Sequence, residues 1–145
     1  MAEDEFVDND YLQRQYYELK SIDEHLKRLD SELSKVDSKI SEVSTIKGFI
    51  TEVSSKSGAE TLVPITDGIF VKARLLEQGE FIVNVGSGIC VPKDTAATLK
   101  LLSDQEEELS KYRGQIMSKM EALDGMARNI EEDFLRKDRE QKSRK

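Results

Sequence analysis

The stretch GIFVKARLLEQGEFIVNVGSGICVPK, residues 68–93, decides the fold of this 145-residue chain. Apolar and polar residues alternate along it and glycines interrupt it, which is typical of short antiparallel strands joined by tight turns. With the residues just before it, the stretch predicts four strands, at residues 61–65, 69–76, 81–85 and 89–91. We therefore expect two β-hairpins over residues 61–92.

The segment before the hairpins has a heptad pattern. Its apolar residues recur at alternating steps of three and four, at Leu19, Ile22, Leu26, Leu29, Leu33, Val36, Ile40 and Val43. This spacing predicts one long helix over residues 9–57 with a coiled-coil seam along one face. After Val43 the pattern passes through Ile46 and Ile50, which indicates a local slip of the seam, and Gly58 is expected to close the helix.

The segment after the hairpins predicts a second helix over residues 94–137, started by Asp94 or Thr95. Its seam positions are Leu102, Glu106, Leu109, Arg113, Ile116, Met120, Leu123, Ala127, Ile130 and Phe134. Eight of these ten positions are apolar. Gly114 and Gly125 are expected to interrupt the helix, each at a cost of about 1 kcal/mol relative to alanine, so this arm should be the looser one.

Two similar helices on either side of a short insert are expected to fold back as an antiparallel pair. The predicted class is α+β, mostly α, with a long antiparallel two-helix coiled coil and a pair of β-hairpins inserted between the helices. The insert then lies at one end and both chain termini lie at the other. Residues 1–10 are acidic and residues 136–145 are mostly basic, so the two ends should attract each other, with residues 138–145 as a frayed tail.

Composition narrows the classes of function. Charged residues make up 35% of the chain, and its formal net charge is −7. A net acidic chain without a long basic stripe is a poor candidate for nucleic-acid binding. No apolar run approaches the ~20 residues of a membrane span, so no membrane partner is expected. The N-terminus lacks the apolar core of a secretory signal, and Cys90 has no second cysteine to pair with, so we expect a cytoplasmic protein.

No group of residues suggests catalysis or ligand binding. The glycines of VGSG at 85–88 lack the lysine and the following helix of a phosphate loop, and predict a hairpin turn. His25 is the single histidine and is expected on a solvated helix face. Cys90 has no CxxC spacing and is expected to be a small strand residue. We expect no enzyme activity, no cofactor and no metal site.

The insert itself is expected to be an assembly module. Two hairpins cannot bury both of their faces alone, and they leave open strand edges. The side chains expected to pair with the same insert in other subunits are Leu62, Val63, Ile65, Ile69, Val71, Phe81, Val83, Val85 and Ile89.

The helix ends opposite the insert gather aromatic and aliphatic residues. They are Phe6, Val7, Tyr11, Leu12, Tyr16, Tyr17, Ile130, Phe134 and Leu135. Leu12, Ile130 and Phe134 fall on the seams and could simply close the coiled coil. Two helix ends offer little area to cover the others, so some should be exposed, and an exposed apolar patch marks a binding surface.

Three segments carry a resemblance to a known family: LVPI at 62–65, GIFVKA at 68–73 and VNVGSG at 83–88. With the helix–insert–helix order, the chain resembles the α class of the prefoldin family. That class has two hairpins between its helices, whereas the β class has one. The resemblance covers almost the whole chain and implies a single prefoldin-like domain over residues 1–145.

The resemblance also implies partners and an activity. It implies a hexamer of two α and four prefoldin β subunits, held by intersubunit β-barrels made from the inserts. The arm tips would bind non-native polypeptides without ATP and pass them to a group II chaperonin. A scaffold that uses the same fold to bind one folded partner is the alternative, and an enzyme or nucleic-acid binder built on the insert is the least favoured hypothesis.

Overall fold

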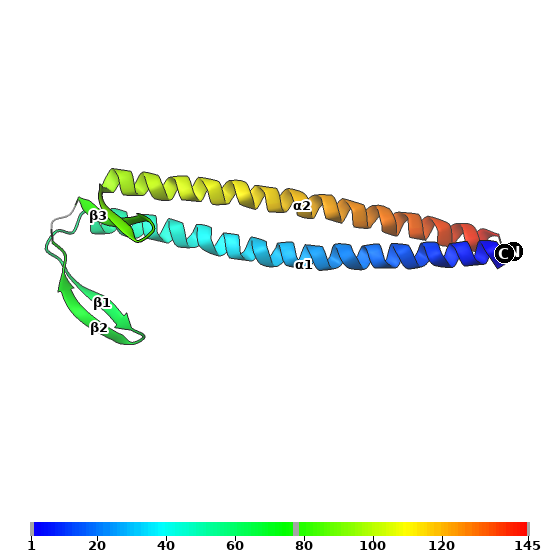
Figure 1. Cartoon of the computed structure of the whole chain (residues 1–145), viewed down its shortest axis with the longest axis horizontal. Coiled ribbons are helices and arrows are strands. Elements are labelled where there is room, and N and C mark those ends of the chain that lie inside the picture. The colour runs from blue at the N-terminus through cyan, green and yellow to red at the C-terminus, as the bar shows by residue number, and fades with distance from the viewer. Residues whose placement is uncertain (1, 77–78, 145) are drawn as a thin grey trace. The chain divides into compact units, whose positions relative to one another are not determined.

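The computed structural model describes residues 2–76 and 79–144, with side chains from Asp8 onward. Two helices flank four strands (Figure 1), in the order α1 (Ala2–Val53), β1 (Glu60–Thr66), β2 (Ile69–Arg74), β3 (Glu80–Gly86), β4 (Ile89–Asp94) and α2 (Thr95–Ser143). The predicted class, mostly α with two hairpins between two long antiparallel helices, is confirmed.

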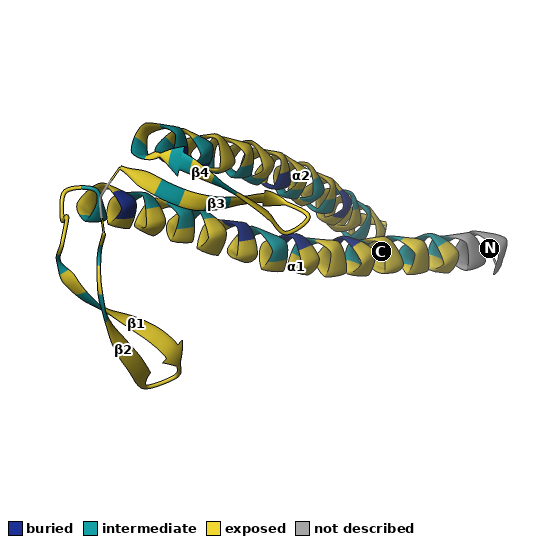
Figure 2. Cartoon of the chain, turned by 60° about the vertical axis from the view of Figure 1, so that its left-hand side comes forward, coloured by how far each residue is buried: buried dark blue, intermediate teal, exposed yellow. Residues whose placement is uncertain are grey.

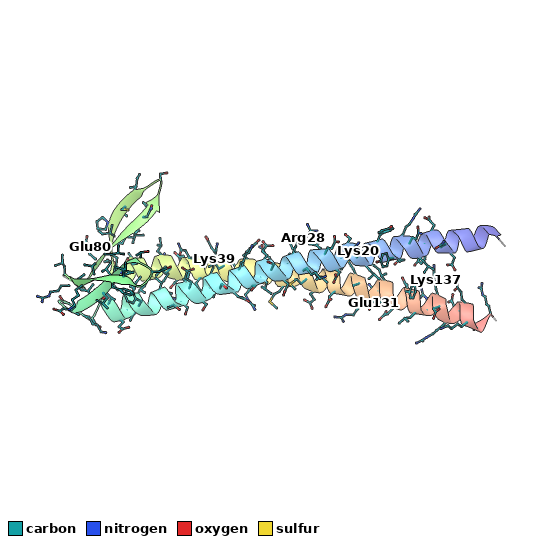
Figure 3. All side chains as sticks on the ribbon, turned by 90° about the horizontal axis from the view of Figure 1, so that it is seen from below. Lys20, Arg28, Lys39, Glu80, Glu131 and Lys137 are labelled. Atoms are coloured by element: carbon teal, nitrogen blue, oxygen red, sulfur yellow. The ribbon has the colours of Figure 1, made fainter. Side chains whose placement is uncertain are left out.

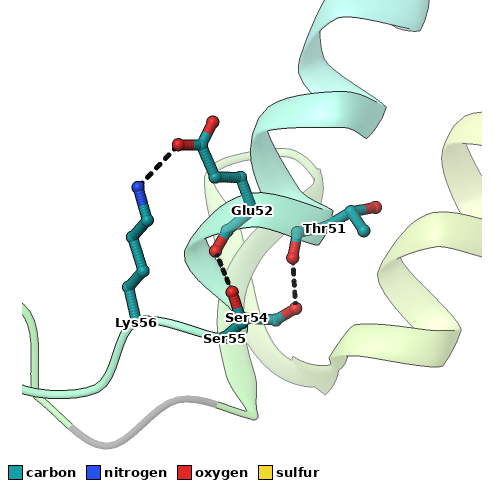
Figure 4. A network of polar contacts seen from close by, with 5 residues as sticks. All are labelled: Thr51, Glu52, Ser54, Ser55 and Lys56. Atoms are coloured by element: carbon teal, nitrogen blue, oxygen red, sulfur yellow. Dashed lines mark hydrogen bonds and ion pairs between the residues drawn. The ribbon is translucent and has the colours of Figure 1, made fainter.

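Helix α1 begins earlier and ends earlier than expected, at Ala2 and Val53. At its C-terminal end the hydroxyls of Ser54 and Ser55 donate hydrogen bonds of 2.8 Å to the carbonyls of Thr51 and Glu52 (Figure 4). These serines add hydrogen bonds to two of the last carbonyls of the helix, of which the Glu52 carbonyl also accepts one from the Ser55 N–H at 3.2 Å.

Gly58, which was expected to close α1, belongs to the insert instead. Its backbone N–H donates to the Leu75 carbonyl at 2.9 Å, which extends the first hairpin by one more pair. Between helix and hairpin, the Lys56 ammonium lies 2.6 Å from the Glu52 carboxylate. This hydrogen bond and the positive charge of Lys56 hold the pKa of the Glu52 carboxyl below its usual range.

Helix α2 corrects two expectations. It runs unbroken through Gly114 and Gly125, and it continues to Ser143 through the segment expected to fray. Ion pairs between residues three and four apart support its last turns, at 3.0 Å between Arg136 and Asp133 and at 3.1 Å between Lys142 and Asp138. At the start of the helix, Asp94 is the capping residue, because its carboxylate accepts a 2.6 Å bond from the Ala97 N–H.

The chain forms two compact units, Met1–Asp37 with Lys111–Lys145, and Ser38–Ser110. In each unit the two helices pack along their seams, and every predicted seam residue of α1 is buried or half-buried. Buried positions recur along both helices while the hairpins are mostly exposed (Figure 2). The buried apolar residues are Ile22, Leu29, Val36, Ile50, Leu102, Ile116 and Ile130.

The sequence indicated a slip of the α1 seam after Val43, but the structure shows no such slip. Ile46 is exposed, and Lys47 takes the next seam position, half-buried, before Ile50. Lys47 donates a hydrogen bond of 2.9 Å to the Glu106 carboxylate on α2. The regular heptad spacing therefore continues, with a charged pair where two apolar residues would ordinarily meet.

The other polar seam position of α2 has a similar explanation. Arg113 Nε donates a 2.6 Å hydrogen bond to the Asp37 carboxylate of α1. One residue earlier, the Tyr112 hydroxyl donates to Glu32 of α1. Both polar exceptions in the predicted α2 seam are thus partners in contacts between the helices.

The two hairpins have the same register, twenty positions apart. Glu60 pairs with Arg74 and Val63 with Val71, while Glu80 pairs with Asp94 and Val83 with Val91. The ladders also shift at equivalent places, between Pro64 and Thr66 in the first hairpin and between Asn84 and Gly86 in the second. The insert is therefore an internal structural repeat.

The turn of the second hairpin requires backbone angles that favour glycine. Ser87 and Gly88 have φ values of 52° and 75°. Positive φ at both central residues is typical of the two-residue turn whose twist best matches that of the flanking strands. In the first hairpin Gly68 has a φ of 80°. The four predicted strands are confirmed, with each boundary within a few residues of its expected place.

Candidate functional site

The insert presents apolar side chains on both faces of both hairpins. Seven of the nine predicted assembly residues are exposed, and Phe81 and Val83 are half-buried. The exposed residues among them are Leu62, Val63, Ile65, Ile69, Val71, Val85 and Ile89. An isolated two-stranded hairpin is marginally stable in water, and both hairpins of the insert also expose a large apolar surface. The insert has the chemistry of a surface that another protein covers.

The sequence prediction missed part of this surface. Phe70 and Ile82 are 55% and 72% exposed, and they alternate with the predicted face of each hairpin. Phe49 and Ile46 on α1 are 63% and 39% exposed in the same compact unit. Their spacing of three along a helix, away from the seam, was the signal that could have identified them.

At the other compact unit, Tyr16 and Tyr17 form the most exposed aromatic pair of α1. Each is 65% exposed, and their ring centroids lie 5.9 Å apart at an interplanar angle of 69°. This edge-to-face contact holds the two rings against each other while both remain accessible. An exposed, mutually supported aromatic pair is suited to contact apolar segments of another chain.

Three predicted tip residues are at least partly covered. Leu12 is half-buried and Ile130 is buried, as residues of the seam. The Lys137 ammonium lies 3.2 Å from the centroid of the Tyr11 ring, where it makes a cation–π contact (Lys137 is labelled in Figure 3). The tip residues Phe6 and Val7 lie outside the described side chains.

Phe134 and Leu135 are exposed at the end of α2. Phe134 was expected on the seam, but 48% of its surface is accessible, and Leu135 is 54% exposed. Asp133 and Lys137 are half-buried, so polar residues replace Phe134 at the inner positions. Leu135 also borders a shallow groove whose other described lining residues are Glu132, Arg136, Arg139, Glu140 and Ser143. This tip surface is apolar with a charged rim.

The described side chains make two contacts where the ends of the chain meet, and the expected attraction of charge, which falls mostly on acids of residues 1–7 outside the described side chains, stays a prediction. Gln141 donates a hydrogen bond to Asp8, and Lys137 lies over Tyr11. Arg136 and Lys142 pair with acids of α2 itself. Among the described side chains, a hydrogen bond to a carboxylate and a cation–π contact therefore join the two helices here.

Among the described residues, no group of His, Cys, Asp or Glu side chains is arranged to hold a metal ion. No described helix is apolar over enough of its length to cross a membrane. Cys90 is exposed on β4, opposite Asn84. His25 is exposed on α1.

Comparison with known proteins gives consistent results. The family described as Prefoldin, prefoldin subunit, matches residues 17–138. The prefoldin subunit alpha of Thermofilum pendens is 33% identical over 78 residues, which are 54% of this chain and 60% of that relative. The prefoldin subunit alpha of Methanococcus aeolicus is 25% identical over 126 residues, which are 87% of this chain and 86% of the relative.

One solved structure shares the fold. It is the cryo-EM structure of filamentous PFD from Methanocaldococcus jannaschii, with a TM-score of 0.71 and 16% sequence identity. The match covers 79% of this chain and 95% of that chain.

Proposed function

The chain belongs to the prefoldin family, and we propose that it is an ATP-independent holdase subunit that binds unfolded proteins at the ends of its paired helices. The family supports a chaperone-type subunit. The observation that carries the finer proposal is the exposure of Tyr16, Tyr17 and Leu135 on a surface that contributes little to the helix seam. No catalytic step is assigned to the chain.

The insert is proposed to hold the subunit in an assembly. Its exposed apolar side chains and open strand edges favour pairing with other inserts into β-barrels. The proposed partners are prefoldin β subunits, in a hexamer of two α and four β chains. In that assembly residues 1–145 act as one prefoldin-like domain in the cytoplasm.

Weak individual contacts are proposed to give reversible holding. Unfolded chains aggregate because burying apolar surface is favourable, by roughly 25 cal/mol per Å². One helix tip offers few apolar side chains, so one contact exchanges quickly. Several arms on one cargo raise the effective affinity through multivalency. Transfer to a group II chaperonin then requires a competing binder and no nucleotide.

The test is aggregation of a chemically denatured protein on dilution without nucleotide, in the presence of the chain and a candidate β subunit. The variant Tyr16→Ser with Tyr17→Ser and Leu135→Ser should assemble normally and lose suppression of aggregation. Met126→Ser is the matched control, since Met126 is 48% exposed on α2 and is not among the tip residues.

Two results would contradict the proposal. If the tip variant suppresses aggregation as well as the wild-type complex does, these three tip residues do not bind cargo. A complex that assembles and suppresses nothing would favour the scaffold hypothesis, in which the same fold binds one folded partner.

A further inference from the structure

The chain contains two Asp–Gly pairs, Asp67–Gly68 and Asp124–Gly125. Such a pair is chemically reactive because glycine has no side chain to shield its backbone nitrogen, which can attack the carboxyl group of the preceding aspartate. Asp67 and Asp124 are both exposed, so solvent reaches both carboxyl groups. The two pairs differ in their backbone structure, and this difference decides which of them reacts.

The first pair forms the turn between β1 and β2 (Figure 1). Thr66 is paired with Ile69, so the turn consists of Asp67 and Gly68 alone. Gly68 has a φ of 80°, in the left-handed region that glycine adopts most readily. Among the residues that the structure describes, neither the Asp67 carboxylate nor the Gly68 N–H has a hydrogen-bond partner. No hydrogen bond therefore restrains either reacting group.

The second pair lies inside α2, many residues from either end of the helix. In an α-helix each backbone N–H donates to the carbonyl four residues earlier, so the Gly125 N–H is already engaged. The Asp124 carboxylate also lies 3.6 Å from the Arg128 guanidinium. A ring between Asp124 and Gly125 can close only after this part of the helix opens, which costs free energy.

We propose that Asp67–Gly68 is a site of spontaneous covalent modification, at which aspartate isomerises to isoaspartate, while the helix protects Asp124–Gly125. The modification is a property of the insert that the proposed holdase function does not require. Its consequence for assembly rests on the proposed assembly role of the insert.

The reaction needs only water and the chain itself. The Gly68 nitrogen attacks Cγ of the protonated Asp67 carboxyl group, so that an N–Cγ bond forms. The nitrogen loses its proton and the Cγ–OH bond breaks, and the two fragments leave together as water. The product is a five-membered succinimide ring that joins the two residues.

Water then opens the ring at one of the two carbonyl carbons bonded to the Gly68 nitrogen. Breaking the bond to Cγ restores aspartate. Breaking the bond to the main-chain carbonyl carbon of Asp67 leaves the two residues joined through Cγ, which is isoaspartate. One water leaves and one returns, so the mass of the chain and its number of carboxylates are unchanged.

Isomerisation changes the geometry of the turn. In isoaspartate the side-chain carbons belong to the main chain, which gains a methylene group between Thr66 and Ile69. A two-residue turn cannot absorb this group, because turn type and loop length fix the register of a hairpin. The first hairpin should therefore lose its pairing of Val63 with Val71.

The internal repeat of the insert provides a comparison within the same chain. Ser87 and Gly88 take the turn positions of the second hairpin that Asp67 and Gly68 take in the first. A serine side chain has no carbonyl carbon for the nitrogen to attack. Only the first hairpin therefore carries the reactive turn, and the second should keep its pairing as the protein ages.

Prolonged incubation of the full-length chain under native conditions, followed by proteolysis and mass spectrometry, tests the proposal. Isoaspartate is recognised by a shift in peptide retention at constant mass and by resistance to a protease that cleaves before aspartate. Modification of Asp67 should be at least about tenfold faster than that of Asp124, because α2 must open before the second ring can form. In urea that unfolds the chain, the two rates should converge.

Two results would overturn the inference. One is an equal rate at Asp67 and Asp124 in the folded chain. The other is an Asp67 that is modified in urea but not in the folded chain.

A pair of variants uses the repeat as its own control. Asp67→Ser copies the second hairpin and should abolish modification of the first turn. Adding Ser87→Asp should move the modification to the second turn, since aspartate tolerates the left-handed φ of 52° at that position. A folded chain that stays unmodified at position 87 in this double variant would contradict the role assigned to the turn.

The aged chain also shows whether the modification affects the insert. Its NMR spectrum should lose the cross-strand contacts between Val63 and Val71 and keep those between Val83 and Val91. Unchanged contacts in the first hairpin would contradict the expected change of register.

Assembly with a candidate β subunit should fall in proportion to the modified fraction. Modification without loss of assembly would leave the isomerisation standing and remove the first hairpin from the proposed assembly role. Normal assembly and holding by a chain that resists modification would remove only the isomerisation, so the two proposals fail separately.

Discussion

Lys47 on α1 and Glu106 on α2 form an ion pair inside the helix seam, with Nζ 2.9 Å from Oε2. Their side chains are 32% and 33% exposed. Lys47→Met leaves the Glu106 carboxylate half-buried without its cation, and should lower the free energy of unfolding by about 1 kcal/mol. Urea unfolding followed by circular dichroism measures this.

The double variant Lys47→Met with Glu106→Leu is the companion measurement. Replacing both partners by apolar residues of similar volume removes the desolvation cost of both charges. It should be at least as stable as the wild-type chain. If the double variant is less stable than Lys47→Met, the ion pair contributes more to the free energy of unfolding than apolar packing at the same positions does.

Ile116 is the most deeply buried side chain of the seam, at 2% exposure. Ile116→Ala should cost about 2–4 kcal/mol, because it removes buried methylene groups and leaves a cavity between two helices that relax only in part. Met126→Ala, on the exposed side of α2, should cost less than 1 kcal/mol. Similar losses for both would contradict the assignment of the seam.

Gly114 and Gly125 lie within α2, and an added Cβ at either one would meet no described atom within 4 Å. Gly114→Ala and Gly125→Ala should therefore each stabilise the chain by up to about 1 kcal/mol. Calorimetry on the two single variants and the double variant checks this.

The double variant Gly114→Ala with Gly125→Ala also tests whether the flexibility of α2 affects cargo binding. A stiffer α2 should narrow the range of cargo sizes for which the complex suppresses aggregation. Denatured proteins of graded length provide the comparison, and an unchanged range would contradict a role for these glycines in flexibility.

Glu52 provides a pH prediction. Its pKa is lowered by the hydrogen bond and charge of Lys56. A lowered pKa in the folded state means that the contribution to stability is present above the unfolded-state pKa and is lost as pH falls through the folded-state pKa. Because the pair is exposed, solvent screening keeps this contribution small.

An NMR titration of the Glu52 side chain measures the effect directly. Lys56→Met should return the Glu52 pKa toward its usual range, whereas Lys47→Met should leave it where it is. If the pKa is the same in the wild-type chain and in Lys56→Met, the contact does not persist in solution.

The heptad pattern and the glycine-punctuated strands predicted the fold well, because each reports directly on burial or on turn geometry. The pattern failed where a charged residue could take an apolar position. Lys47 was overlooked in favour of Ile46, since sequence periodicity weighs hydropathy and not the partner across the seam. Phe134 was misplaced for the same reason, because Asp133 and Lys137 turn inward at the end of α2.

The candidate surfaces were only partly predictable. Exposure of Tyr17 and Leu135 followed from counting how many apolar residues two helix ends can cover. Which residues of a strand turn their backbone groups toward the partner strand did not follow from the sequence, because this depends on which way each backbone N–H points. That direction becomes known only once Leu75 is seen bonded to Ala59.

The twenty-residue offset between the hairpins has a genetic consequence. Removing residues 61–80 would join Glu60 to Phe81, and Glu60 would take the place of Glu80 opposite Asp94. The remaining hairpin would keep its register, its bulge and its connection to α2. One in-frame deletion or duplication of twenty residues would thus change the number of hairpins by one and leave the register of the remaining hairpins unchanged.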